Sequence, residues 1–391
     1  MTGSNRGFVA PIVGILMGLI LAACGGTSEP VAAPSSASAS PAVAASAAAA
    51  PARGAASTTA TTGKIPGHDK KLDLTKPLPP LSPVVTVKAR VGNSTTTAPF
   101  WYALDRGYFD QLGIKFEVVN ITSSADITGP MATGQLDVAG AAAGPGIYNA
   151  ITRGIGVTAE ADDGKLMVGL SGAAAVVKHG ASGYGSDWCA LKGKTVGGID
   201  TATNFYTTMV KALQSCNLTV KDVNLPAMIP FPVLNQAVAN GSVDVAFQVD
   251  PFVTTGVAQG IIDKWKPAED AWPNQQMNFL LYSPEFVKKS DAALRFMVAY
   301  VAGIREYNAA LAPGGNKQEF AELIAAHLGG SAQTYLSINP TGVDKTGQID
   351  MASTKEEVQI FQNAGSIPAG PINLNWVKSD ILKQAQGYLA P

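Results

Sequence analysis

The run from Asn93 to Phe109 has the residue types and spacing of a noncovalent ligand site. Small hydroxyl and amide side chains crowd together just before Pro99, which suits the first turn of a helix. These side chains are Asn93, Ser94, Thr95, Thr96 and Thr97. They can hydrogen-bond a solute, and a helix start adds free N–H donors and the positive end of the helix dipole. The alternative is a solvated loop that binds nothing.

The neighbouring elements would position this loop. The alternating run from Val85 to Val91 predicts a half-buried strand. Phe100, Ala103 and Leu104 then share one helical face, and Gly107 can end that helix. A strand, a polar loop and a helix start place the loop outside the carboxyl end of the strand, where open α/β sheets bind ligands.

A short internal repeat indicates a second unit of the same plan. The hexapeptide GQLDVA at 134–139 recurs as GSVDVA at 241–246. Each copy follows a helical stretch, at 125–133 and 231–240, and leads into an apolar run that predicts a buried strand. The shared position within the local pattern argues against a chance match.

The rest of the chain alternates between strands and helices up to Ile262, which predicts largely parallel sheets. Further strands are expected at 114–119, 157–161, 173–178, 195–199, 220–225 and 278–282, and further helices at 145–152, 203–215 and from Asp250 onward. Beyond Ile262 helices dominate, at 290–311, 317–328, 353–363 and 376–389. The third of these opens with a capping box, Ser353 and Glu356.

The first residues read as a targeting signal rather than as part of the fold. Arg6 precedes an apolar run, Phe8 to Ala22, that is too short for a comfortable membrane span. The run ends in Leu-Ala-Ala-Cys24, which resembles the bacterial lipoprotein signal, so residues 1–23 are the expected signal peptide and Cys24 the lipidated residue. The alternative is an ordinary secretory signal with a chance cysteine. A lipid would anchor the protein without a membrane span.

Residues 24–83 are rich in Ala, Ser and Pro, and we expect a lipid anchor followed by a disordered tether. An Ala-rich helix at 42–50 is the alternative, but Pro41 and Pro51 bracket it.

Composition restricts the partners of the remaining chain. The 28 Lys and Arg residues balance 29 Asp and Glu residues, so no strong field favours nucleic acid. Beyond the tether ~300 residues remain, which fits two lobes. In an exported protein, Cys189 and Cys216 are expected to form a disulfide, and two buried free thiols are the alternative. No Cys and His spacing indicates a metal site, and we expect no cofactor.

The chain resembles the type II solute-binding proteins of ABC importers, in the branch for nitrate, sulfonates, taurine and the thiamin pyrimidine precursor. The resemblance rests on four stretches in order: PFWYALDRGYF at 99–109, Gly113-Ile114, 134–139, and LKGKTVG at 191–197. It implies a two-lobed α/β fold that closes over a solute by a hinge. The expected parts are 84–180 for the start of lobe one, 181–277 for lobe two, and 278–391 for the return to lobe one and a helical extension.

The same resemblance implies four site segments, each following a strand end. The first segment is the loop from Asn93 to Thr97, which we call the hydroxyl loop. The other implied substrate-binding residues are Phe100, Trp101, Ala142, Ala143, Asp200, Thr201, Thr203, Asn204, Phe205, Phe247, Gln248, Asp250 and Phe252. Any one of the polar residues could instead cap its own helix. Because these segments contain no Arg, Lys or His, we expect either an oxyanion or sulfonate held by helix N-termini, or a small aromatic, pyrimidine-type compound, with another kind of solute as the remaining alternative.

The expected function is capture of a small-molecule solute by an extracytoplasmic, membrane-anchored lipoprotein. It would act as a monomer and deliver the solute to the permease of an ABC transporter. A sensory lipoprotein is one alternative. An enzyme of thiamin pyrimidine synthesis is another, but His68, His179 and His327 lie outside the four segments, so we expect no enzyme.

Overall fold

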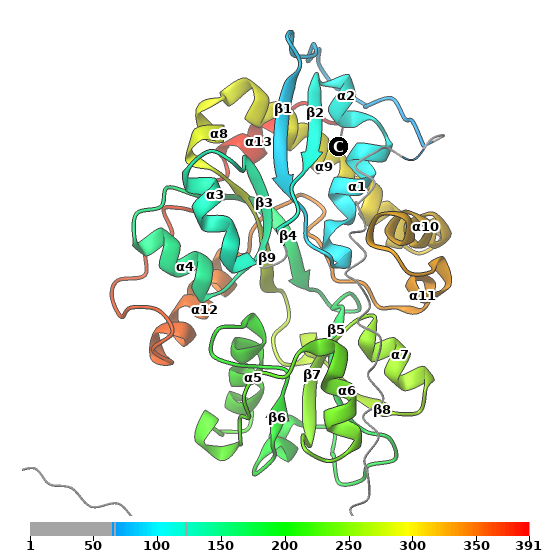
Figure 1. The fold of residues 1–391 in the computed structure, drawn as a ribbon, viewed down its shortest axis with the longest axis vertical. Coiled ribbons are helices and arrows are strands. Elements are labelled where there is room, and N and C mark those ends of the chain that lie inside the picture. Colours follow the sequence, from blue (N-terminus) through cyan, green and yellow to red (C-terminus); the bar gives the residue numbers. More distant parts are fainter. Residues whose placement is uncertain (1–64, 66–67, 122–123, 391) are drawn as a thin grey trace, which may run out of the picture. The chain divides into compact units, whose positions relative to one another are not determined.

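The computed structural model describes residues 65, 68–121 and 124–390. The expected signal peptide, Cys24 and most of the expected tether lie outside these residues. Two sheets, each flanked by helices, form two lobes (Figure 1). The two-lobed α/β fold is therefore confirmed.

Lobe one contains a five-stranded sheet with the order β2-β1-β3-β9-β4. Its strands are β1 (Val85–Arg90), β2 (Ile114–Val118), β3 (Val138–Ala142), β4 (Thr158–Leu166) and β9 (Gln275–Tyr282). β1 pairs in parallel with β2 and β3, whereas β9 runs antiparallel to β3 and β4.

Lobe two contains a four-stranded sheet with the order β6-β7-β5-β8. Its strands are β5 (Ala173–Lys178), β6 (Val196–Gly197), β7 (Val245–Val249) and β8 (Ile262–Pro267). Only β6 and β7 pair in parallel, because β5 runs antiparallel to both of its neighbours. The expectation of largely parallel sheets is thus corrected to mixed sheets. β5 follows the first crossover into lobe two, and β9 follows the second crossover back into lobe one. Their directions are therefore set by the crossovers and not by the right-handed βαβ connection that makes strands parallel.

The chain crosses between the sheets at 167–172 and 268–274. The expected boundaries, after 180 and after 277, would have assigned β5 to lobe one and the start of β9 to lobe two. Apolar composition predicts that β5 is a strand, but it does not predict which sheet the strand joins.

Apolar periodicity, with Pro at helix starts and Gly at helix ends, predicted the positions of most helices. The bounds of α4 (Pro145–Thr152), α9 (Ser290–Leu311) and α10 (Lys317–Leu328) are those expected. The other helices of the two lobes are α1 (Ala98–Asp105), α2 (Tyr108–Gln111), α3 (Thr128–Ala132), α5 (Asn204–Gln214), α6 (Phe231–Ala239), α7 (Phe252–Ala258) and α8 (Pro284–Lys288). Helix α9 packs closely on α1 at Gly303, where an added Cβ would lie 2.0 Å from the carbonyl oxygen of Pro99.

The C-terminal extension adds α11 (Ala332–Ser337), α12 (Met351–Asn363) and α13 (Asp380–Gln386). The N-cap of α12 is Asp350, whose carboxylate accepts from the N–H of Ser353, so the expected capping box is wrong. The expected helix at 376–389 is limited to α13, and the expected strand at 220–225 begins as a short 3-10 helix, Val220–Asp222. In that helix Thr219 caps Lys221, and this local bond competes with an extended conformation.

Residues 68–83, which we call the N-terminal strap, do not form a disordered tether as expected. Leu72 is 6% exposed and belongs to the core of lobe one. Thr75 donates its N–H to the carbonyl of Tyr388, and Arg295 donates to the carbonyl of Pro79. The low average hydrophobicity of the tether concealed the leucines, which provide enough buried surface to order the strap.

Within the described part of the chain, we find no helix with the length and apolar character that a bilayer crossing requires.

Candidate solute-binding site

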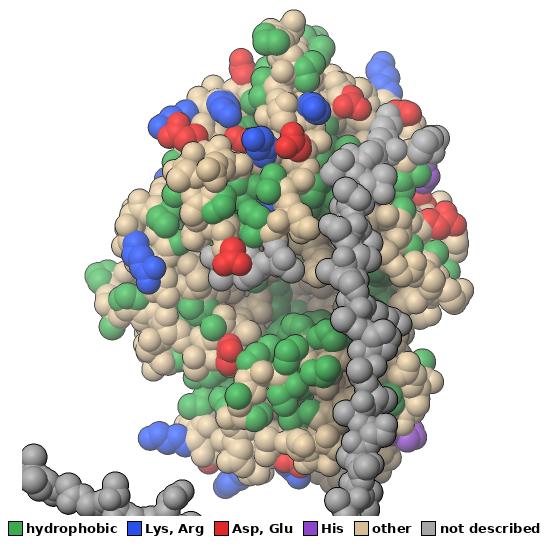
Figure 2. Space-filling view, viewed as in Figure 1, with side chains coloured by type: hydrophobic (Ala, Val, Ile, Leu, Met, Phe, Trp, Pro, Cys, Tyr) green, Lys and Arg blue, Asp and Glu red, His purple; other side chains and the backbone are tan. Residues whose placement is uncertain are grey.

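A cavity of about 310 Å³ lies between the lobes, at the starts of α4 and α5. It is lined by Ala142, Ala143, Gly144, Gly146, Ile147, Ala202, Thr203, Asn204, Phe205 and Phe231. The structure therefore brings together the second and third of the four expected site segments. Figure 2 shows a hollow between the lobes with hydrophobic side chains of lobe two below it.

Two helix N-termini meet at this cavity. Gly144 precedes α4 in an extended conformation and Pro145 occupies its first turn, while Thr203 precedes α5. Neither helix start has a side-chain cap. Pro145 has no N–H, and Ile147 and Tyr206 donate to the carbonyls of Gly144 and Thr203. The first-turn donors that remain for a solute are the N–H groups of Gly146, Asn204 and Phe205.

The polar side chains of the lobe-two segment are arranged around the start of α5. Asn204 Nδ2 donates to the carbonyl of Met277 on β9 at 2.9 Å and so joins lobe two to lobe one. Thr203 Oγ1 donates to the carbonyl of Asp200, whose carboxylate accepts from the N–H of Ala202. Thr201 is exposed beside them. The Asp200 turn therefore presents Asn204 and Phe205 to the cavity, and its own carboxylate has a structural partner.

None of the ten lining residues carries a charge. Phe205, Phe231 and Ile147 provide apolar walls, and the amide of Asn204 and the helix N–H groups provide hydrogen bonds. The cavity can therefore hold a molecule with an apolar body and a hydrogen-bonding group.

The hydroxyl loop does not line this cavity. Asn93 and Ser94 are exposed, whereas the three threonines that follow are buried in the 3-10 helix Thr95–Thr97. Thr96 Oγ1 lies 2.8 Å from Ser94 Oγ and accepts from Asn278 Nδ2 at 3.2 Å. Thr97 Oγ1 accepts from the indole N–H of Trp101 at 3.1 Å. These hydroxyls attach the loop to its own lobe.

The expected aromatic contacts of α1 are corrected. Phe100 is fully buried and packs against Phe116, Phe296 and Tyr300. The indole of Trp101 stacks on His327 with 4.2 Å between ring centroids. Both rings lie on the face of α1 that packs on the core of lobe one, so they are not exposed to a solute in this conformation.

The fourth expected segment is also largely structural. Phe247 is fully buried and stacks on Trp188, and the buried amide of Gln248 donates to the carbonyl of Phe231 and to Asn235. Phe252 is half-buried, and its carbonyl accepts from Asn235. Gln248 and its neighbours fix the start of α6, and Phe231 at that start lines the cavity. These residues therefore support the cavity wall without lining it.

The C-terminal extension passes between the lobes, which the sequence did not indicate. Asn339 donates its N–H to Asp250 Oδ2 at 3.0 Å, and Thr341 donates its N–H to Thr95 Oγ1 at 3.4 Å. Thr341 also forms an isolated bridge with Ser171 in the first crossover. The extension therefore contacts both the first and the fourth expected segments and uses polar groups that had been assigned to a solute.

Two buried carboxyl groups contact the start of β9, next to the second crossover. Asp162 on β4 accepts from the N–H of Asp344 and from Gln276 on β9, and burial raises the pKa of its carboxyl to about 6. Glu357 on α12 is also fully buried, and burial raises its pKa to about 8. The signal available in the sequence was the adjacent acids Asp162 and Asp163 in a strand that follows the apolar stretch of lobe one. No such signal marked Glu357.

None of the three histidines lines the cavity, and each has its own acidic neighbour. His327 lies 3.1 Å from both carboxylate oxygens of Asp105, His179 pairs with Asp263, and His68 lies near Glu319. They do not form a common metal site.

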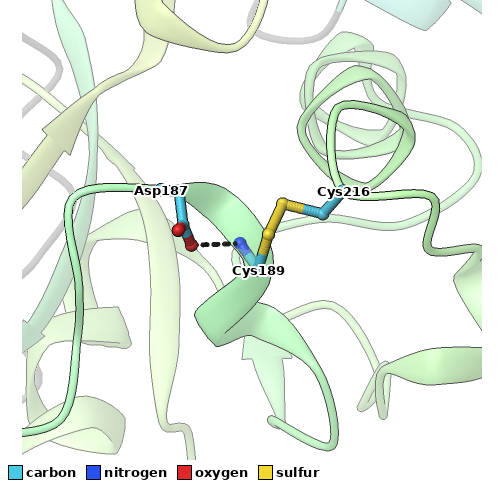
Figure 3. Close-up of side chains that lie close together, drawn as sticks. All are labelled: Asp187, Cys189 and Cys216. Carbon is cyan, nitrogen blue, oxygen red and sulfur yellow. Dashed lines mark hydrogen bonds between the residues drawn. A yellow bond between two sulfur atoms is a disulfide. The ribbon is translucent and has the colours of Figure 1, made fainter.

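Asp187, Cys189 and Cys216 are close enough to hold an ion, but the two sulfurs are bonded to each other (Figure 3). The disulfide is therefore confirmed, and no thiolate remains for a metal. Asp187 instead accepts from the N–H of Cys189 at 2.9 Å and caps the short helix Trp188–Leu191.

This architecture is that of the two-lobed periplasmic binding proteins. The chain belongs to the NMT1-like family, which it matches over residues 82–325. No curated protein matches this chain by sequence.

Solved structures share the fold at low identity. The periplasmic aliphatic sulphonate binding protein SsuA from Escherichia coli has 14% identity and a TM-score of 0.60, over 77% of this chain and 91% of that chain. The periplasmic nitrate-binding protein NrtA from Synechocystis has 15% identity and a TM-score of 0.56, over 78% and 85%. The desulfurization enzyme DSZB has 14% identity and a TM-score of 0.54, over 77% and 98%.

Proposed function

We propose that this protein captures a small organic solute between its two lobes and delivers it to the permease of an ABC importer. The supporting observation is the cavity at which the uncapped starts of α4 and α5 meet, one from each lobe. A site divided between two lobes gains contacts when they close, so solute binding would drive closure.

The solute we propose has an apolar or aromatic body. A cavity of about 310 Å³ is larger than a small inorganic oxyanion needs, and its walls include two phenyl rings. A sulfonate group would be held by helix N–H donors rather than by a cation. A pyrimidine-type ring would stack on Phe205 or Phe231 and hydrogen-bond to Asn204.

The rest of the proposal concerns location. The lipoprotein-like signal that ends in Leu-Ala-Ala-Cys24 supports an extracytoplasmic protein anchored through Cys24. We propose that it acts as a monomer. A catalytic role has less support, because the lining residues include no acid, base or nucleophilic pair.

Mass spectrometry of small molecules released from the denatured, freshly purified protein tests the proposal. We expect one organic compound in stoichiometric amount, and titration calorimetry with that compound should give a Kd of micromolar or tighter. Co-purification of the permease would separate an importer subunit from a sensor. Conversion of the bound compound to a product would contradict the proposal.

A further inference from the structure

The Glu357 carboxyl group joins both lobes at one point. Tyr148 Oη on α4 donates to its Oε2 at 3.0 Å, and Thr207 Oγ1 on α5 lies 3.2 Å from its Oε1. Gln275, at the start of the crossover strand β9, donates from Nε2 to the same Oε1 at 2.8 Å. Four elements therefore meet at a side chain that has no exposure to solvent.

Two of these contacts have equivalent positions. Tyr148 is the fourth residue of α4, and Thr207 is the fourth residue of α5. Both lie one turn inside the helix starts that form the walls of the inter-lobe cavity. A group that fixes these two side chains also fixes the separation of the two helix N-termini.

Burial without a counter-charge favours the neutral form of the Glu357 carboxyl group. Thr207 donates its single hydroxyl proton to the carbonyl of Asn204 at 2.6 Å. Because the same hydroxyl also lies 3.2 Å from Glu357 Oε1, its proton is shared between the two acceptors, or a neutral acid contributes its own proton to the contact. The buried pKa of about 8 agrees with a neutral acid at pH 7.

No charged group contacts the carboxyl from the elements around it. Tyr148 faces it from α4, Thr207 from α5 and Gln275 from β9. On α12 the charged neighbours Lys355 and Glu356 are both exposed, and Glu356 pairs with Lys211 of α5 at 2.6 Å.

We propose that Glu357 is the positioning residue of the inter-lobe cavity, and that as a neutral acid it holds the starts of α4 and α5 at the separation that a solute requires. That the cavity binds a solute rests on the proposed function. The hydrogen bonds of Glu357 to Tyr148, Thr207 and Gln275, which we call the clasp, can be tested without a solute. Helix α12 lies beyond residues 82–325, so this role is not part of the family match.

The test is hydrogen exchange, measured by mass spectrometry on the solute-free full chain. In Glu357→Ala we expect exchange to rise at least tenfold in peptides covering α4 and α5, at the N–H groups that are hydrogen-bonded within these helices. Peptides covering β1 and β2 should change less than twofold. Glu357→Gln is neutral at every pH and keeps an acceptor for Tyr148, but its amide nitrogen cannot accept from Gln275 Nε2, so it should restore protection more fully in α4 than in α5. Glu356→Gln removes a neighbouring, exposed carboxylate and serves as the matched control.

Two results would overturn the proposal. One is protection of both helices within twofold of wild type in Glu357→Ala. The other is a uniform rise across the protein, which would mean a purely structural role. If Glu357→Ala does not fold, Tyr148→Phe and Thr207→Val remove one contact each, and each should loosen its own helix start.

A pH series separates this proposal from the proposed function. In the wild type, exchange in both helices, corrected for the intrinsic rate, should rise above about pH 8 as the acid loses its proton. Glu357→Gln should show no such rise. A flat wild-type profile would refute the neutral clasp even if a solute is found, and the expected profile would support it even if none is found.

Discussion

The backbone N–H of Asn339 donates to Oδ2 of Asp250 at 3.0 Å, which connects the C-terminal extension to lobe two. The other oxygen of Asp250 accepts from the N–H and hydroxyl of Thr254 in α7. The carboxylate is therefore occupied on both sides, and we assign Asp250 to the support of the lobes and not to solute contact.

Substituting Asp250 should accordingly affect stability. Asp250→Ala removes a helix cap and the bond to Asn339, so the free energy of unfolding should fall by about 2 kcal/mol. Asp250→Asn keeps the cap oxygen and should lose about half as much. Urea unfolding of the three proteins measures both effects. A loss below about 0.5 kcal/mol in Asp250→Ala would mean that the contact with Asn339 contributes nothing.

The pKa of Glu357 predicts a pH-dependent stability. Its folded-state value, about 8, lies above the ordinary value of 4.5, so the folded protein binds one proton more in this interval. The associated stability is complete below about pH 4.5 and is lost as the pH rises to about 8. Between about pH 5 and about pH 9, the wild type should lose on the order of 4 kcal/mol relative to Glu357→Gln. Parallel curves for the two proteins would contradict this.

Asn204→Ala should weaken solute binding. The amide lines the cavity and bonds to Met277, so its loss should cost about 1–3 kcal/mol, or roughly five- to a hundredfold in affinity. Calorimetry with the co-purified solute measures this. Thr96→Ala is the control, because its hydroxyl is bound to Asn278 away from the cavity and should affect stability instead. If Thr96→Ala weakened solute binding and Asn204→Ala did not, the hydroxyl loop would be part of the binding site and the cavity at Asn204 would not.

The N-terminal strap should contribute to the stability of lobe one. Leu72→Ala removes a buried side chain and should lower the free energy of unfolding by about 2–4 kcal/mol. Lys71→Ala, at the exposed neighbouring position, should have almost no effect. If thermal unfolding does not distinguish these two variants, the strap is not part of the cooperative unit.

Membrane partitioning of the protein tests the proposed lipid anchor at Cys24. Expressed in a bacterium as the full chain, the protein should partition with membranes, and Cys24→Ser should release it or block processing. Equal membrane association of the two proteins would exclude lipidation of Cys24.

Features encoded by nearby residues were predictable from the sequence. The bounds of α9 and α10 follow from periodicity and from Gly329, which ends α10 with a positive φ of 81°. The starts of α4 and α5 were expected to lie at strand ends, and they meet at the cavity. The disulfide followed from compartment and cysteine number.

Features that depend on distant contacts were not predictable. The apolar face of α1 was consistent with both a core and a ligand wall, and only the packing of Phe296 and Tyr300 decides for the core at Phe100. The roles of Asp250 and Glu357 depend on partners far along the chain. The direction of β5 depends on the crossover, which no local pattern indicates.

The two lobes also differ in when they can be completed during synthesis. Every strand of lobe two comes from the continuous stretch 173–267, so that sheet can assemble without waiting for later parts of the chain. Lobe one must wait for β9, and its strap waits longer, because Leu74 pairs with Leu389 near the end of the chain. The lobe that begins first is therefore finished last, and until then the strap has its early contacts with Gln111 and Leu112 but not its bridge to Leu389.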